Sequence, residues 1–143
     1  MQNQILILDQ DQVFSDLLGQ LLQSQGYDVV TSKVGAVDPR DRKGIDPALV
    51  ILNLMRPDGE AAGVCRSMRA ASDVPVLALS PINDPNVIAG LLDAGADDHL
   101  VKPVAGGVLI AHVRKLMRRN GSLEPAVRLI QPLARAQTQP LQP

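Results

Sequence analysis

Four short apolar stretches of this 143-residue sequence are each followed at once by side chains that could do chemistry. They supply a carboxylate, two carboxamides, a hydroxyl and an amine. In order along the chain, these side chains are Asp9 and Gln10, Asn53, Ser80 and Lys102. They can act together only if the apolar stretches that precede them lie side by side with their carboxyl ends at one edge.

The pattern between these stretches predicts such an arrangement. Short runs of β-forming residues alternate with segments whose apolar residues recur at helical spacing, as in residues 13–22. Alternation of this kind is typical of an α/β protein in which helices cover both faces of a parallel sheet. The five predicted strands lie near residues 5–8, 28–31, 49–52, 74–79 and 99–101. In open α/β sheets the functional crevice lies at the carboxyl ends of the strands, where the candidate residues fall.

Two parts of the sequence depart from this alternation. Residues 34–44 contain Pro39 and a charged run, so we expect the second crossover to be short or irregular. From residue 120 onward proline and glutamine dominate, and such a stretch cannot form a packed unit by itself. The sequence therefore predicts one domain over residues 1–119 and a tail or linker over residues 120–143.

Composition excludes several classes of function. The single Cys65 rules out an internal disulfide framework and a multi-cysteine zinc site, and His99 and His112 are too few for a metal cluster. One Phe, one Tyr and no Trp leave almost nothing on which bases could stack, so direct nucleic-acid binding is not expected. No apolar run is long enough for a membrane span and no signal sequence is visible, so we expect a cytoplasmic protein.

Four sequence segments together resemble the receiver domains of bacterial two-component response regulators, over about residues 4–118. The segments are ILILDQDQ, LVILNLMRPDGEAAGVCRSMR, PVLALSP and GADDHLVKP, in this order. The last one looks most like the subfamily that carries a winged-helix DNA-binding domain after the receiver. The resemblance implies a doubly wound, five-stranded parallel sheet of strand order 2-1-3-4-5, with five helices.

The resemblance also implies roles for the candidate residues. In this family an aspartate after the third strand accepts a phosphoryl group from a histidine kinase, and that position is Asn53 here. The acidic pair that holds Mg²⁺ corresponds to Asp9 and Gln10. Ser80 and Lys102 match the residues that contact the phosphoryl oxygens. The switch aromatic of the fifth strand is replaced by His99.

These departures predict a pseudo-receiver, a domain that keeps the fold and has lost the aspartyl-phosphate reaction. A carboxamide is a poor nucleophile. We expect Asp11 to point outward, which leaves Asp9 as the single carboxylate for Mg²⁺, and one carboxylate binds this ion weakly. No other cofactor is expected, and a histidine kinase is a doubtful partner. We expect Asn53 to hydrogen-bond to Lys102 and Ser80, and Lys102 to form an ion pair with Asp9.

Such a domain would be a non-enzymatic signalling module that acts through a protein partner or a homodimer and regulates an attached or partner DNA-binding domain. The winged-helix subfamily uses the face built from the fourth helix, fifth strand and fifth helix. Two positions usually charged there are Val108 and His112, so the usual salt-bridge network is incomplete. The candidate contacts are Ile88, Leu91, Asp97, Asp98, Ala111, His112 and Arg114.

Two alternatives remain open at this stage. The first is a phosphoaccepting receiver that uses another carboxylate, for which Asp11 and Asp58 are the acidic candidates nearby. The second is a sensor of an anion or small ligand at the vacated pocket, where Lys102 and the amides at the strand ends could attract an anion.

Overall fold

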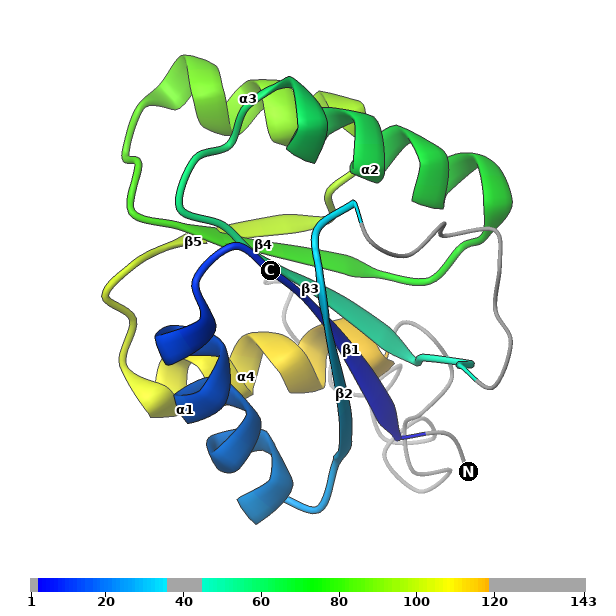
Figure 1. Cartoon of the computed structure of the whole chain (residues 1–143), viewed down its shortest axis with the longest axis vertical. Helices are drawn as coiled ribbons and strands as arrows, with labels where there is room; N and C mark the ends of the chain where they lie inside the picture. Colours follow the sequence, from blue (N-terminus) through cyan, green and yellow to red (C-terminus); the bar gives the residue numbers. More distant parts are fainter. Residues whose placement is uncertain (1–2, 36–44, 119–143) are drawn as a thin grey trace, which may run out of the picture.

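In the computed structural model, the described residues form five strands and four helices, and each of the strands except the second is followed by a helix (Figure 1). The structure describes residues 3–35 and 45–118. The tail predicted from residue 120 falls outside these residues, as does the predicted irregular crossover apart from Val34 and Gly35. The elements are β1 (Gln4–Asp9), α1 (Gln12–Ser24), β2 (Asp28–Lys33), β3 (Leu49–Asn53), α2 (Gly59–Ala71), β4 (Val76–Ser80), α3 (Pro85–Ala94), β5 (Asp98–Val101) and α4 (Gly106–Met117).

The strands form one parallel sheet in the order β2-β1-β3-β4-β5, which confirms the predicted fold class. In the register of this sheet Asp9, the last residue of β1, lies beside Asn53, the last residue of β3. On its other side Asp9 lies beside Lys33 at the end of β2. The carboxyl ends of the strands therefore meet at one edge.

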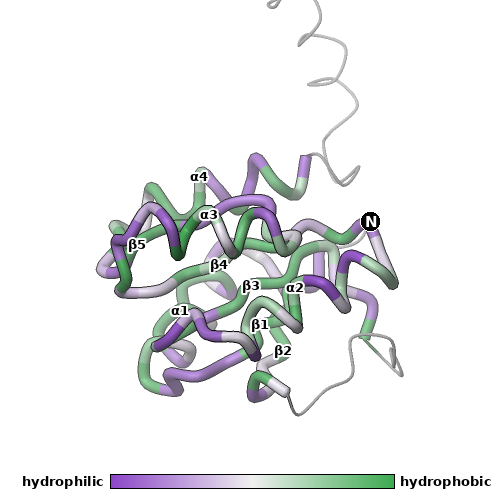
Figure 2. Tube along the Cα trace, turned by 90° about the horizontal axis from the view of Figure 1, so that it is seen from above, coloured by the Kyte–Doolittle hydropathy of each residue, from purple (hydrophilic) through white to green (hydrophobic). Residues whose placement is uncertain are grey.

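Apolar residues fill both faces of the sheet, as expected for strands without clear alternation. Figure 1 shows α1 and α4 on one face and α2 and α3 on the other, and Figure 2 shows hydrophobic residues along the inner strands. Successive residues of a strand point to opposite faces, so Ile5 and Ile7 pack with α1 and α4 whereas Leu6 and Leu8 pack with α2. The sheet, packed on both faces, thus holds the strand ends from which the loops at its carboxyl edge begin.

Acidic N-caps start three of the helices, each shortly after the carboxyl end of a strand. Asp11 accepts a hydrogen bond from the Phe14 N–H at the start of α1, and Asp58 caps α2. Asp84 caps α3 ahead of Pro85, a residue well suited to the first helical turn. Such caps satisfy backbone N–H groups that the helix leaves unpaired. They fix where each helix begins relative to the strand before it.

No helix within residues 3–35 and 45–118 combines the length and the apolar character that crossing a membrane requires. The strand predicted over residues 74–79 begins two residues later, at Val76. Pro75 has no N–H for the sheet, and it contributes only its carbonyl, which accepts from the Val50 N–H at 3.0 Å.

Candidate functional site

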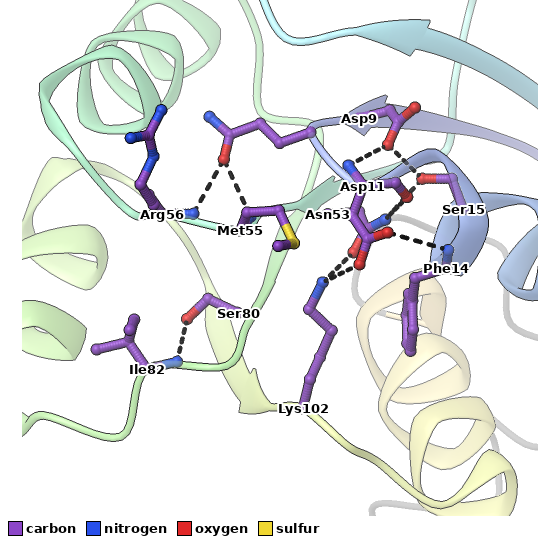
Figure 3. A network of polar contacts seen from close by, with 11 residues as sticks. Asp9, Asp11, Phe14, Ser15, Asn53, Met55, Arg56, Ser80, Ile82 and Lys102 are labelled. Carbon is purple, nitrogen blue, oxygen red and sulfur yellow. Dashed lines mark hydrogen bonds and ion pairs between the residues drawn. The ribbon is translucent and has the colours of Figure 1, made fainter.

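Three of the five candidate side chains lie near one another at the carboxyl edge of the sheet (Figure 3). Asp9 and Asn53 end neighbouring strands, and Lys102 follows β5 and points back toward them. Ser80 ends β4 but forms its contacts on the side of β5. Gln10 binds the loop after β3. The predicted residues therefore share an edge but divide into separate hydrogen-bonded groups.

Asn53 is fully buried, and both ends of its carboxamide are engaged. Its Oδ1 accepts a hydrogen bond from Lys102 Nζ at 2.8 Å. Its Nδ2 donates to Ser15 Oγ at 2.6 Å and to the backbone carbonyl of Asp11 at 3.0 Å. An ammonium group can only donate, so Lys102 fixes which end of the amide faces it. The predicted contact with Lys102 is present, whereas Ser15 stands where Ser80 was predicted.

The predicted ion pair between Lys102 and Asp9 is wrong. Lys102 Nζ lies 3.4 Å from Asp11 Oδ2, with the lysine side chain 8% exposed and the aspartate side chain 26% exposed. The ammonium also lies 4.6 Å from the centre of the Phe14 ring, a cation–π distance. Burial lowers the pKa of Lys102, and the negative charge of Asp11 opposes that shift.

Asp9 does not reach the lysine because its Oδ1 atom serves two donors close by. It accepts from the backbone N–H of Asp11 at 2.6 Å and from Ser15 Oγ at 2.8 Å. The prediction that Asp11 points outward is also wrong. Its Oδ1 accepts from the Phe14 N–H at 3.3 Å, and this capping geometry turns Oδ2 toward Lys102. An aspartate directly before a helical apolar pattern is the sequence signal for such a cap.

Ser15 is a site residue that the sequence analysis missed. It is 1% exposed, and its hydroxyl donates to Asp9 and accepts from Asn53, so it links the first strand end to the third. Its position in the first turns of α1 places it over the strand ends. A serine within an amphipathic helix gives no sign of this role in the sequence.

Replacing Ser15 by alanine tests how much this link contributes. We expect Ser15→Ala to lower the free energy of unfolding by about 1 kcal/mol, because Asp9 and Asn53 each lose one buried partner but keep another. Urea unfolding measures the change. Ser24→Ala is the control, since Ser24 is exposed and bonds only to its own helix. Equal effects of the two variants would contradict a specific role for Ser15.

Gln10 holds the loop that follows Asn53. Its Oε1 accepts from the backbone N–H groups of Met55 at 3.0 Å and Arg56 at 3.1 Å. Its own backbone N–H donates to the carbonyl of Asn53 at 2.8 Å. The uncharged Gln10 side chain therefore links the loop after β1 to the loop after β3.

Ser80 and His99 form a second group at the edge. Ser80 Oγ and His99 Nε2 are 3.0 Å apart, and Ser80 Oγ also accepts from the Ile82 N–H at 3.3 Å. His99 Nδ1 is buried without a partner, and burial lowers the pKa of this histidine. A neutral imidazole fits this setting, because its Nε2 can accept a hydrogen bond from the Ser80 hydroxyl. The residue at the switch position is thus tied to the end of β4.

Only some of the residues predicted to contact a partner lie at the surface between α3, β5 and α4. Ile88 is half-buried and Ala111 is exposed, so both are accessible. Asp98 Oδ2 lies 2.6 Å from His112 Nδ1 and 3.1 Å from Lys115 Nζ. Burial works against ionisation of Asp98, but the hydrogen bonds from His112 and Lys115 outweigh it and lower its pKa. This face therefore carries a charged cluster of its own.

Three residues predicted on that face lie elsewhere. Leu91 is 2% exposed and packs in the core. Asp97 accepts from the Val76 N–H at 2.7 Å and lies 3.4 Å from Arg69, at the junction of β4 and α2. Arg114 donates to Gln25 at 3.2 Å, just after α1. Helix phase and strand pleat decide which neighbours point outward, and these three point inward or to another side.

Comparison with known proteins agrees with the resemblance seen in the sequence. Residues 5–114 match the model of the response regulator receiver domain family. The chain is 36% identical over 127 residues to the DNA-binding response regulator MtrA of Mycobacterium tuberculosis, covering 88% of this chain and 55% of MtrA. It is 36% identical over 120 residues to the sensory transduction protein RegX3 of Mycobacterium bovis, covering 82% and 52% of the two chains. The chain thus spans about half the length of these relatives.

Solved structures show the same fold. A two-component response regulator from Clostridium difficile superposes with a TM-score of 0.69 at 27% identity, covering 82% of this chain and 98% of that one. The BeF3-activated N-terminal receiver domain of Klebsiella pneumoniae RstA gives 0.69 at 26% identity, covering 81% and 99%. Members of the family are generally signalling proteins rather than enzymes. The chain belongs to the response regulator receiver domain family and is a receiver domain of two-component signalling.

Proposed function

We propose that this chain is a pseudo-receiver that signals without phosphorylation, through contacts with other proteins. One observation carries the proposal: the acceptor position is a fully buried asparagine whose amide is bonded at both ends. The lone pair of an amide nitrogen is delocalised, so Asn53 offers no anionic oxygen that could attack phosphorus. Lys102, which would contact phosphoryl oxygens in the family, already has Asn53 and Asp11 as partners.

The donor set also supports very weak Mg²⁺ binding. Mg²⁺ in proteins prefers one or two carboxylates together with phosphate oxygens and water. Of the three family positions only Asp9 is a carboxylate, and one of its oxygens already accepts two hydrogen bonds. Within the described residues, no group of three His, Cys, Asp or Glu is placed to hold a metal ion. The residues present therefore do not fit the family's metal site.

The two carboxylates considered as alternative acceptors, Asp11 and Asp58, both cap helices. Asp11 caps α1 and pairs with Lys102. Asp58 caps α2 by accepting from the N–H groups of Glu60 at 3.1 Å and Ala61 at 3.3 Å. Phosphorylation of either one would remove a cap that stabilises its helix. This argues against the alternative of a displaced phosphoacceptor.

The output is proposed to pass through the face between α3, β5 and α4. The relatives are named DNA-binding response regulators, and this chain spans about half of them, so a DNA-binding domain in the same or another chain is the proposed target. The face offers the Asp98 cluster. Val108 in α4, a position that the family resemblance places on this face, is 48% exposed. Exposed apolar and charged residues together are typical of protein contact sites.

Intact-mass spectrometry after treatment with acetyl phosphate and Mg²⁺ tests the proposal. We expect no adduct of about 80 Da, the mass that one phosphoryl group adds. Beryllofluoride, a mimic of the phosphoryl group, should likewise leave the amide NMR spectrum unchanged. A stoichiometric adduct would overturn the proposal and favour Asp11 or Asp58 as the acceptor, and peptide mapping would show which of them carries it.

A further inference from the structure

An open pocket of about 550 Å³ lies next to the buried site, between the ends of β1 and β2 and the start of α2. Its polar lining comes from Asp9, Gln10, Lys33, Arg56 and Glu60, and Met55 adds an apolar side. Neither Asn53 nor Lys102 lines it. The pocket therefore shares Asp9 and Gln10 with the candidate site but does not include the acceptor position, and its volume lies within the range typical of small-molecule sites.

Two cations in this pocket are available to a ligand. Lys33 at the end of β2 and Arg56 in the loop after β3 are exposed. Neither makes an ion pair with another residue in the part of the chain that the structure describes. Gln10 adds a donor, because its Oε1 accepts from the loop while its Nε2 group bonds to none of the residues that the structure describes. Arginine binds phosphate and carboxylate groups through paired N–H donors.

Two carboxylates face the same space. Glu60 is exposed in the first turn of α2, and Asp9 lies under the pocket at the end of β1. The carboxylate of Glu60 comes so close to Gly35 that a Cβ atom there would be 3.0 Å from Oε2, so this glycine leaves it room. Two cations and two carboxylates make a pocket of balanced charge. Its best complement carries both an anionic and a cationic group.

We infer that this pocket binds a small molecule with an oxyanion at one end and an amine at the other. The oxyanion, a carboxylate or a phosphate ester, is held by Arg56, Lys33 and the Gln10 amide. The amine faces Glu60. Because Arg56 belongs to the loop that follows Asn53 and is hydrogen-bonded to Gln10, a ligand in the pocket would contact that loop directly. The inference rests on the proposed function in one respect: ligand binding would supply the input signal to a receiver that is not phosphorylated.

Backbone amide NMR titrations of the full chain at constant ionic strength test the binding. The probes are phosphoethanolamine, β-alanine, inorganic phosphate and ethanolamine. We expect saturable shifts at Gln10, Lys33 and Arg56 with a probe that carries both charges, and an affinity at least about fivefold higher than for inorganic phosphate or ethanolamine. Whichever of phosphoethanolamine and β-alanine binds more tightly identifies the kind of oxyanion. Absence of saturation with both up to about 20 mM would overturn the inference.

Variants separate a built site from general charge attraction. Arg56→Gln and Lys33→Gln should each weaken binding of the better probe by about tenfold. Arg66→Gln is the matched control, because Arg66 is exposed on α2 outside the pocket and the variant makes the same change in charge. Glu60→Gln should reduce the preference for the two-charge probe over inorganic phosphate. Equal weakening by Arg66→Gln, or an unchanged preference in Glu60→Gln, would contradict the site.

The two proposals fail separately. Uptake of phosphate in the mass experiment would contradict the pseudo-receiver and leave the titration as it stands. Lack of ligand binding with no phosphate uptake would contradict the pocket alone.

Discussion

The double variant Asn53→Asp/Gln10→Asp is expected to take up phosphate from acetyl phosphate at least about tenfold faster than either single variant, a difference of about 1.4 kcal/mol in the activation barrier. Asn53→Asp alone supplies the nucleophile but leaves Mg²⁺ with two carboxylates and an amide at the family positions. Gln10→Asp alone adds a carboxylate for Mg²⁺ but supplies no nucleophile at position 53. Only the double variant has carboxylates at all three positions, since Asp9 is already present.

The contacts in the structure support this non-additive result. An aspartate at position 53 would turn the hydrogen bond with Lys102 into an ion pair. Replacing Gln10 by the shorter aspartate would also release the N–H groups of Met55 and Arg56. Those donors then become available to an anion at the end of β3.

Phosphate incorporation for all three variants at fixed Mg²⁺ provides the measurement, with metal affinity titrated separately. Circular dichroism and urea unfolding serve as controls that each variant is folded. Equal inactivity in a folded double variant would mean that further residues, with His99 and Pro81 as the first to examine, have reshaped the crevice. The carboxyl edge of the sheet would then be better explained as a binding surface for a partner protein.

Lys102→Ala is expected to lower the free energy of unfolding by about 2 kcal/mol. Removing the ammonium leaves Asn53 Oδ1, a fully buried acceptor, without its donor. It also leaves the carboxylate of Asp11 without a counter-charge, though this group is 26% exposed and keeps its capping bond. The loss is therefore smaller than for a fully buried ion pair, for which about 3–5 kcal/mol is typical.

Urea unfolding of Lys102→Ala beside Lys115→Ala checks this value. Lys115 pairs with Asp98, but its side chain is 53% exposed, so the control should change stability by less than about 0.5 kcal/mol. Lys102→Met separates packing against Phe14 from the loss of the donor, because it keeps most of the stem. A change below about 0.5 kcal/mol in Lys102→Ala would show that the bond to Asn53 contributes nothing to stability.

The sequence by itself determined the class of fold and the identity of the altered positions. Apolar runs such as residues 49–52 can be buried on both faces only in a covered parallel sheet, so their alternation with helical patterns predicts the layers. The strand order followed from the family resemblance and not from the periodicity. The amides Asn53 and Gln10 are likewise visible without coordinates, because the chemistry of a carboxamide does not depend on its surroundings.

Only the tertiary structure decided which side chains touch. Asp9 and Asp11 both lie near enough to Lys102 for their negative charges to act on it, but the capping geometry of α1 selects Asp11 by turning its second oxygen toward the lysine. Ser15 enters the site because α1 lies across the strand ends. Leu91 points inward because of the phase of α3. Residue types set the available chemistry, but a hydrogen bond depends on distances of a few tenths of an ångström, which only the packed chain specifies.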